Sequence, residues 1–419
     1  MRRPLRALSI VALALAFPAI LAAQEITATI AGTVTDQSGA ALPGATVIAR
    51  NLGKGVTTEA VTSRTGRYTL PYLTNGDYDI TFSMPGFKAH VAKGIALHVN
   101  DRLEVGASLK VEGVTETVEV TASAQLIQPG PAVQNLMGST QVQELPLNNR
   151  NFVQLATLVP GVNSSLSDEV GIGLTSTVSL SIAGARRNAV NWFVDGASNV
   201  DVGSNITLLN TPTLESIEEF KIITSSYAAE WPRSGGGIIN VVTKSGSNVF
   251  RGSAYEFYRN NGLNANSYFR KQSTNPAISG APPKLDYHNF GATLGGPLMK
   301  DKVFFFGSYE RRKIERAPSS LSANTIDPAW LTDPDNLNYV APALRDANAV
   351  RLLSAWPAPN TGTNQFQSSA ANKQDTTQYV GRLDYYLNPK WRLMGRYTYD
   401  LSETTEPGGL FFEIGRAHV

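Results

Sequence analysis

The sequence of 419 residues contains no cysteine and has little charge, since only 17% of its residues are Asp, Glu, Lys or Arg. Without cysteine the chain has no disulfide bond, no thiolate nucleophile and no thiolate metal ligand. The formal net charge is +2, which gives no argument for binding nucleic acid. After the first 23 residues there is no run of eighteen apolar residues, so the sequence predicts no membrane-spanning helix there.

Recognisable catalytic and metal-binding motifs are missing as well. The histidines are scattered, at His90, His98, His288 and His418, and none belongs to an H-E-x-x-H pattern. The nearest approach to a ligand spacing, His98-x-x-Asp101, we interpret as a pair at the end of a strand. Neither a G-x-S-x-G elbow nor a phosphate-binding loop occurs. We therefore expect no enzymatic activity, no metal site and no cofactor.

What the sequence does contain begins with a basic and then apolar N-terminus. Three arginines precede the apolar run Ala7–Phe17, and small residues precede Gln24. This pattern is typical of a secretory signal peptide, which we assign to residues 1–23. The alternative is a membrane anchor, but the run is shorter than the ~20 residues that a spanning helix needs. We expect the mature protein to be exported.

Short alternating segments separated by turns extend from Ile26 to about Val111. Strands that recur about every 8–12 residues, with turn residues between them, predict a β-sandwich. In the first strand Ile26, Ala28 and Ile30 share a face, and we expect Gly32 to shift this alternation to Val34. The final predicted strand, residues 102–111, places five residues on one face, namely Leu103, Val105, Ala107, Leu109 and Val111.

This region contains the motifs G-T-V-T-D-x-x-G-x-x-L-P-G-A-T-V (Gly32–Val47), S-x-x-G-R-Y (Ser63–Tyr68), L-x-x-G-D-Y (Leu73–Tyr78) and Gly86-Phe87. Together they resemble the carboxypeptidase regulatory-like domain. The resemblance implies a transthyretin-like β-sandwich over residues 24–112, without peptidase activity, because the ligands of a zinc peptidase are absent. Domains of similar fold sometimes bind carbohydrate. The aromatic residues are therefore either core residues or a platform for sugars, and they are Tyr68, Tyr72, Tyr78 and Phe82.

The character of the sequence changes after Ala124. Residues 137–162 have apolar residues at strand and then helical spacing, and residues 214–219 predict a short acidic helix. The segments S-I-A-G-A-R-R, W-F-V-D-G, I-E-E-F-K-I-I and G-G-G-I-I-N-V-V-T-K-S-G follow in that order. In this order they resemble the plug domain of TonB-dependent outer-membrane receptors of the Oar-like branch, which implies an α+β plug over residues 126–245. We expect Arg186 and Arg187 to contact acidic residues of the barrel, because a charge in the lumen needs a partner.

From Phe250 onward, segments of about ten residues alternate as transmembrane strands do. In residues 378–387 one side carries Tyr379, Leu383, Tyr385 and Leu387, and the other carries Arg382 and Asp384. The links are alternately long (260–285, 312–377) and short (297–301, 388–390). A soluble sandwich also alternates, but long outer loops and short periplasmic turns are typical of an outer-membrane barrel. We assign residues 246–419 to the first strands and loops of a transmembrane antiparallel β-barrel.

This predicted barrel is incomplete. Five strands cannot close a plugged barrel, which in the family that the chain resembles has about 22 strands. The sequence ends in E-I-G-R-A-H-V, without the terminal aromatic strand that such barrels usually carry. We expect an N-terminal fragment of a longer receptor, and whether the last few residues are native stays open.

A linker at residues 113–125 joins the predicted sandwich and plug, and its centre alternates like a strand. This centre resembles the TonB box, and its residues are Glu116, Thr117, Val118, Glu119, Val120, Thr121 and Ala122. An unpaired strand between two domains leaves N–H and C=O groups for a partner's sheet, so TonB is the expected periplasmic partner. The alternative interpretation is a last sandwich strand or a first plug strand.

The sequence therefore predicts a mainly β protein: a transthyretin-like sandwich, an α+β plug and the start of a transmembrane antiparallel barrel. The leading hypothesis is a TonB-dependent receptor in the outer membrane of a Gram-negative cell, with its N-terminal domain in the periplasm. It would import an extracellular substrate, a glycan or a peptide, through TonB, with outer-membrane lipid around it and no nucleic acid. The alternatives are an Oar-like surface adhesion or organisation barrel without transport, and a carbohydrate-binding module on a barrel anchor.

Overall fold

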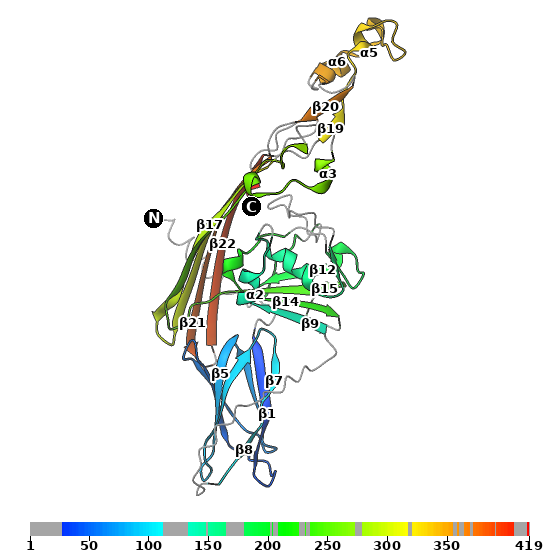
Figure 1. The fold of residues 1–419 in the computed structure, drawn as a ribbon. Coiled ribbons are helices and arrows are strands. Elements are labelled where there is room, and N and C mark those ends of the chain that lie inside the picture. The colour runs from blue at the N-terminus through cyan, green and yellow to red at the C-terminus, as the bar shows by residue number, and fades with distance from the viewer. Residues whose placement is uncertain are drawn as a thin grey trace, which may run out of the picture.

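The computed structural model describes residues 27–111, 133–147, 150–164, 180–201, 203, 208–225, 231, 235–272, 279–316, 321–354, 358–359, 364–368, 372–389, 391–405 and 417–418. These residues form three packed parts and a projecting arm (Figure 1). A β-sandwich lies at one end, the plug lies in the middle beside a curved sheet of long barrel strands, and the arm extends from the far end of those strands. Within these residues, no helix is long and apolar enough to cross a membrane.

The sandwich consists of two sheets that share one core. The first sheet contains β1 (Ala28–Asp36), β4 (Arg67–Leu73), β7 (Arg102–Glu104) and β8 (Ala107–Leu109). The second contains β2 (Thr46–Asn51), β3 (Thr57–Val61), β5 (Gly76–Ser83) and β6 (His90–Leu97). In the first sheet β1 pairs antiparallel with β4 and parallel with both β7 and β8. Alternate residues of both sheets point inward, and among them Ile30, Leu70 and Ile80 are fully buried.

Two predictions for the sandwich strands are wrong. Ala28, Ile30, Gly32 and Val34 all face the core, so Gly32 does not shift the alternation. Gly32 is needed there because a Cβ atom would collide with the backbone carbonyl of Val105. The final strand is not continuous either.

That predicted final strand, residues 102–111, is divided into β7 and β8. Val105 lies at the break, where its N–H donates to Ala31 O (2.8 Å) and its carbonyl accepts from the Tyr68 hydroxyl (2.6 Å). Leu103, Val105, Ala107 and Leu109 are buried as predicted, but Val111 is 60% exposed. The Tyr68 contact thus takes the carbonyl that a continuous strand would use.

The candidate sugar platform does not form. Tyr68, Tyr78 and Phe82 are buried in the core of the sandwich, and the rings of Tyr68 and Phe82 pack edge to face, 5.7 Å apart. Tyr72 alone among the four is exposed. Three of these aromatic residues are therefore core residues, which was the alternative to the sugar platform.

The plug is built on one sheet with the strand order β13, β12, β15, β14, β9. These strands are β9 (Val133–Gly138), β12 (Val190–Val194), β13 (Ala197–Ser198), β14 (Ile217–Ser225) and β15 (Gly237–Thr243). The pair β12–β15 is parallel, and every residue of both strands is buried. The remaining elements are α2 (Ser139–Glu144), η1 (Phe152–Leu158), β10 (Val162–Ser164), β11 (Leu180–Ile182), η3 (Arg187–Ala189) and η4 (Leu214–Ser216). Phe152 and Leu155 of η1 pack on the sheet in the largest plug cluster.

The predicted acidic helix at residues 214–219 is wrong. Only the 3-10 turn η4 is helical, and β14 begins at Ile217. β14 pairs with β15 on one side and with β9 on the other, so tertiary pairing prevails over the local helical spacing. As a result, Glu219 and Lys221 lie on a strand, two residues apart, and share one face of the sheet.

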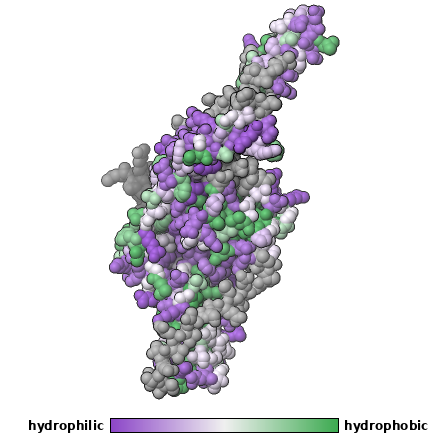
Figure 2. Space-filling view, in the orientation of Figure 1, coloured by the Kyte–Doolittle hydropathy of each residue, from purple (hydrophilic) through white to green (hydrophobic). Residues whose placement is uncertain are grey.

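The barrel sheet contains the five predicted strands, paired antiparallel in chain order. They are β16 (Arg251–Asn260), β17 (Leu285–Met299), β18 (Val303–Arg316), β21 (Asn372–Asn388) and β22 (Trp391–Thr405), and the short β23 (Ala417–His418) follows. In β21 the alternation is as predicted: Arg382 and Asp384 are buried, and Leu383 and Tyr385 are exposed. Hydrophobic residues reach the surface along this wall (Figure 2).

Both long links of the barrel contain structure of their own. The first contains η5 (Asn261–Leu263) and α3 (Tyr268–Lys271). The second forms the arm, in which β19 (Leu321–Asn324) pairs with β20 (Gln365–Ser368) below the short helices α5 (Ala329–Thr332), η6 (Pro342–Leu344) and α6 (Ala347–Ser354). Arg345 ties this tip together by donating to Leu331 O (2.6 Å) and Val340 O (2.8 Å). Figure 2 shows that the tip is mostly hydrophilic.

Candidate functional site: contacts of the plug with the barrel and the sandwich

The predicted TonB-box residues, Glu116–Ala122, lie outside the described residues. The structure describes the two strands that flank them. β8 of the sandwich ends at Leu109, and β9, at the edge of the plug sheet, begins at Val133. The segment that resembles a TonB box therefore connects the sandwich directly to the edge strand of the plug.

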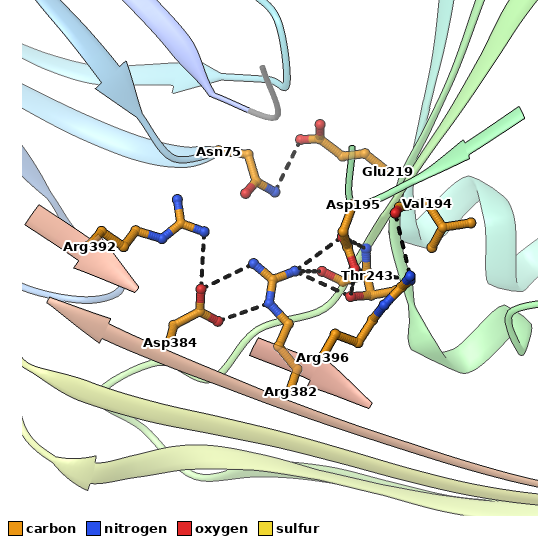
Figure 3. Close-up of polar contacts among 9 residues, drawn as sticks. All are labelled: Asn75, Val194, Asp195, Glu219, Thr243, Arg382, Asp384, Arg392 and Arg396. Atoms are coloured by element: carbon orange, nitrogen blue, oxygen red, sulfur yellow. Dashed lines mark hydrogen bonds and ion pairs between the residues drawn. The ribbon is translucent and has the colours of Figure 1, made fainter. Parts of the chain in front are cut away.

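Asp195 is the centre of the contact between the plug and the barrel wall (Figure 3). It occupies the two-residue turn between β12 and β13, with Gly196 after it, and both have positive φ (48° and 79°), as a type I′ hairpin requires. Its carboxylate accepts the N–H (2.8 Å) and the hydroxyl (2.6 Å) of Thr243. The same carboxylate lies 3.4 Å from Arg382 Nη1 and 3.2 Å from Arg396 Nη1. The turn thus presents one buried anion to two barrel cations.

Arg382 of β21 completes this network from the barrel side. Its guanidinium forms two hydrogen bonds with Asp384 (2.9 and 3.2 Å) and donates to the carbonyl of Thr243 (2.6 Å). Arg392 of β22 donates to the same Asp384 (3.0 Å). Arg396, also on β22, additionally donates to Val194 O at 3.4 Å. Together, three arginines of the wall neutralise Asp384 and the Asp195 carboxylate of the plug (Figure 3).

This chemistry suits a contact that has to be held and also opened. Removing one partner of a buried ion pair typically costs about 3–5 kcal/mol, so the assembled network fixes the plug in one position. Charged groups are hydrated well when they are exposed, whereas separating apolar surfaces costs free energy in proportion to their area. The contact through Asp195, Arg382 and Arg396 is therefore made by groups that water can solvate once they separate.

A second contact with the wall involves Arg150 of the plug. This buried residue donates to Glu215 (2.7 Å), and its guanidinium lies 3.7 Å from the ring centre of Phe257 on β16. The ring of Tyr255, on the same strand, lies 5.6 Å away, and its hydroxyl donates to Glu310 of β18 (2.9 Å). Arg150 is thus held between a plug carboxylate and two aromatic rings of the barrel.

The sandwich contacts the plug through Glu219 and Lys221 of β14. The carboxylate of Glu219 accepts the backbone N–H of Val99 (2.9 Å) and lies 3.0 Å from His98 Nδ1. The ammonium of Lys221 donates to Val99 O (2.8 Å) and lies 3.3 Å from the carboxylate of Asp101. The pKa of His98 is raised above its ordinary value, and its hydrogen bond with Glu219 is the largest cause.

The sandwich also contacts the short-turn end of the barrel. Asn248, in the connection from the plug to β16, donates its backbone N–H to Gly53 O of the sandwich (2.9 Å). Its side chain exchanges hydrogen bonds with Asp301 in the turn between β17 and β18 (2.7 and 3.0 Å). Close by, Lys54 lies 5.9 Å from the ring centre of Tyr386. The sandwich therefore meets the plug and the barrel at the same end.

A polar cavity of about 450 Å³ lies where the three parts meet. The sandwich contributes Asn51 and Lys54 to its wall, and the plug contributes Glu218 and Lys244. Residues of β16, β17 and β18 and of the connection before β16 also line it. Burial raises the pKa of Glu218 and lowers the pKa of Lys244. The cavity therefore contains charged groups that are partly withdrawn from water, beside the contacts that hold the plug.

The expected plug–barrel contacts of Arg186 and Arg187 stay a prediction. Both side chains are exposed at η3, which follows β11. The contacts that the structure does describe come instead from Arg150 and Asp195 of the plug. Asp195 enters the sequence-based predictions only within the W-F-V-D-G segment, although an Asp-Gly pair after a strand signals a turn at which a polar side chain leaves the sheet. Among the described residues, no group of three or more His, Asp or Glu is placed to hold a metal ion.

Comparison with family models matches residues 29–110 to the carboxypeptidase regulatory-like domain and residues 242–417 to an outer membrane β-barrel domain. The chain is also 30% identical over 381 residues to the TonB-dependent transporter Oar of Myxococcus xanthus. That match covers 86% of this chain and 32% of the relative, so the chain spans about a third of the relative's length.

Solved structures with similar folds include the outer membrane transporter YddB from Escherichia coli, with a TM-score of 0.41 and 14% identity over 65% of this chain and 33% of that one. The siderophore receptor PirA from Acinetobacter baumannii has a TM-score of 0.34 and 16% identity, covering 68% of this chain and 43% of that one. By sequence, then, the chain joins a carboxypeptidase regulatory-like domain to an outer-membrane β-barrel domain and is a relative of the TonB-dependent transporter Oar.

Proposed function

We propose that this chain is part of an outer-membrane receptor that binds a substrate outside the cell and imports it with energy delivered by TonB. The observation that carries the proposal is the polar attachment of the plug to the barrel wall through Asp195, Arg382 and Arg396. A domain that fills a barrel and is attached by hydratable groups is suited to repeated displacement. Similarity to the transporter Oar supports the same function.

In this proposal TonB pairs with residues 116–122 by adding a strand in the periplasm. The segment connects to β9, so force applied to it acts on the edge of the plug sheet. The energy comes through TonB from the inner membrane, which agrees with the absence of a nucleotide-binding motif from the sequence. The sandwich lies in the periplasm, the outward face of the barrel strands lies in outer-membrane lipid, and the arm lies outside the cell.

The proposal is tested by deleting Glu116–Ala122 from the full-length receptor. We expect the deletion to abolish binding of the purified periplasmic domain of TonB, measured by isothermal titration calorimetry, because the pairing strand is gone. Barrel insertion, measured by the heat-dependent shift in electrophoretic mobility, should be unchanged. A matched control deletes the next seven residues, Ser123–Pro129.

The control deletion should retain TonB binding. Equal TonB binding by both deletion variants would refute a role for residues 116–122. Absence of TonB binding by the unmodified receptor would instead favour the second candidate function, a surface adhesion or organisation barrel without transport. The carbohydrate-module alternative loses its main support, because three of the four aromatic residues on which it relied are buried.

A further inference from the structure

One end of the sandwich makes all the contacts with the rest of the chain that are described above. Three turns form this end: residues 51–55 after β2, residues 74–77 before and at the start of β5, and residues 98–101 after β6. Gly53 accepts the backbone N–H of Asn248, which in turn bonds to Asp301 of the barrel. Thr74 accepts from the hydroxyl of Tyr386 of the barrel, and the turn at residues 98–101 contacts β14 of the plug. The sandwich therefore stands end-on against the barrel and the plug, as Figure 1 shows.

The contact with β14 recognises backbone groups of the sandwich. Val99 offers its N–H to Glu219 and its carbonyl to Lys221, so both polar groups of one peptide segment are satisfied by plug side chains. Asn75, from another turn, points toward Glu219 at 3.5 Å (Figure 3). These bonds depend on the position of the turn and not on the side chain of Val99. Two side chains of opposite charge thus define one docked position of the sandwich.

The burial of these side chains shows that they depend on the sandwich. Lys221 is 1% exposed and Glu219 is 5% exposed. A buried ammonium or carboxylate is stable only when it is paired and hydrogen-bonded. The partners described for both charged ends lie in the sandwich, at Val99, His98 and Asp101. If the sandwich were undocked, water would have to replace every one of these contacts.

The two domains nevertheless keep separate apolar cores. The buried apolar residues of the sandwich form one cluster, and those of the plug form two others, with no residue shared. Contacts between domains that are mostly polar are the ones that open readily. The sandwich–plug contact is therefore specific, because its charges are paired, and separable, because little apolar surface is lost.

Glu219 and Lys221 lie next to β9, the first strand after the linker. In the sheet, Glu219 is paired with Gly138 and Lys221 with Leu136, both on β9. Residues 110–132, which include the linker, connect β9 to the sandwich strand β8. A force on the linker therefore acts on the sandwich at one end and on the neighbour of β14 at the other, with the Glu219 and Lys221 contacts between them.

We propose that Glu219 and Lys221 form a latch that holds the sandwich across the short-turn end of the plug and barrel, and that force on the linker releases it. The proposal rests on the proposed function, in which TonB supplies that force at residues 116–122. With the latch closed, the sandwich covers the end of the plug at which an imported substrate would leave. Release of the sandwich is then a step that precedes passage.

The test applies force to single full-length receptors in a supported bilayer, with the periplasmic domain of TonB on the tip of a force microscope. We expect a first extension event, release of the sandwich, before the plug extends. Glu219→Gln should shorten the lifetime of the closed latch at constant force by about tenfold or more, the loss expected for hydrogen bonds to a charged group. His98→Ala, on the sandwich side, should shorten it too, and this variant leaves the plug unchanged.

Glu144→Gln is the control. Glu144 is an exposed acidic residue of the plug, on α2, and no described hydrogen bond or ion pair joins it to the sandwich. The closed lifetime of this variant should equal that of the unmodified receptor. In a second experiment, His98→Cys with Glu219→Cys, joined by a cleavable dimaleimide, should remove the first event until the link is cut. The absence of native cysteine from this chain makes that link selective.

Unchanged lifetimes in Glu219→Gln and His98→Ala would overturn the latch, as would a first event that persists in the bridged protein. Failure of the TonB domain to attach at all would overturn the proposed function instead. The two failures are therefore distinguishable, because attachment is scored before any extension is measured.

Discussion

At the scale of single residues, the domain contacts coincide with left-handed backbone conformations. Asn100, Arg150, Asp195 and Asp301 have φ of 60°, 49°, 48° and 61°, and each lies in or beside a contact between two parts of the chain. Asn and Asp adopt this region more readily than other residues, but a long side chain such as that of Arg150 does so at a cost. Such conformations persist where the surroundings determine them. Arg150 is held in its left-handed conformation by its contacts with Glu215 and the barrel rings.

The latch should depend on pH through His98. Hydrogen bonding to Glu219 raises the pKa of His98 in the docked state, with Asp101 acting in the same direction, while burial and Lys221 oppose it. In the released state Glu219 and Lys221 are lost while Asp101 stays beside His98 in the sandwich, so the pKa of His98 falls back toward its ordinary value. The extra stabilisation is therefore fully present below about pH 6.5. It is lost as the pH rises through the raised docked value, so the closed lifetime should be longer at low pH.

The measurement is the closed lifetime of the latch between about pH 5.5 and 8.5, a range that contains the ordinary pKa of histidine. His98→Gln keeps a hydrogen-bonding side chain but cannot titrate in this range, so its lifetime should be nearly independent of pH. A pH dependence that survives in His98→Gln would assign the effect to another group and remove His98 from the explanation.

Local patterns describe single residues of the contacts but not their partners. The D-G turn at Asp195 and the inward side of Arg382 both follow from local patterns. Their pairing does not, because 187 residues separate them and no local rule connects two such positions. Lys221 is a similar case. Within I-E-E-F-K-I-I it is one polar residue of a strand, and its partners come from a separate domain.

At the scale of elements, β21 allows a test of which side of the barrel sheet faces lipid. Leu383 and Leu387 are both on the outward side, and each is 45% exposed. Leu387 is next to the turn that precedes β22, whereas Leu383 is further along the strand, toward its middle. Leu383→Arg should destabilise the barrel by about 2–4 kcal/mol if the residue lies near the middle of the membrane. Urea unfolding of the full-length receptor in lipid vesicles measures this.

Leu387→Arg is the control for depth. A charge near the membrane surface costs only about 0–1 kcal/mol, so this variant should unfold close to the unmodified receptor. Equal destabilisation by the two substitutions would contradict the prediction that Leu383 and Leu387 lie at different depths in the membrane.

The choice between helix and strand was predictable where the spacing of apolar residues was the only influence on it. Alternation over long segments identified all five barrel strands, and in β18 and β21 alternate side chains are buried while those between them are more exposed. It failed at residues 214–219, where pairing of β14 with two neighbours decides between helix and strand. It failed again in the last sandwich strand, where the Tyr68 hydroxyl takes the carbonyl of Val105. Both errors come from contacts that are distant in the sequence.

At the scale of the whole molecule, the two ends of the barrel sheet differ. The long links lie at the end that carries the arm, and the short turns lie at the end that the sandwich contacts (Figure 1). If the sandwich is periplasmic, proteinase K added to intact cells should cut the arm, within residues 321–368, and leave the sandwich whole. The sandwich should be degraded only after the outer membrane is permeabilised. Mass spectrometry of the fragments makes the distinction, and cleavage of the sandwich on intact cells would reverse the orientation.

Sequence motifs identified the domains of the molecule, but they did not predict how the domains are arranged. The sandwich motifs, the ordered plug segments and the alternating links each describe one part. How the sandwich stands against the plug depends on a few side chains, among them Glu219 and Asn248, whose neighbours in sequence give no sign of a partner. Local patterns reflect burial within a domain, whereas docking depends on surfaces that the chain brings together only after each domain has folded.

The arm has a consequence for how such a receptor can diversify. Its tip is held by its own bonds, from Arg345 to Leu331 and Val340, and it joins the barrel through the narrow pair β19–β20. Mutations, insertions or exchanges in the tip therefore leave the pairing of β18 with β21 intact. A loop module with its own bonds and a narrow attachment can therefore vary in sequence and length without disturbing the strands that hold the plug.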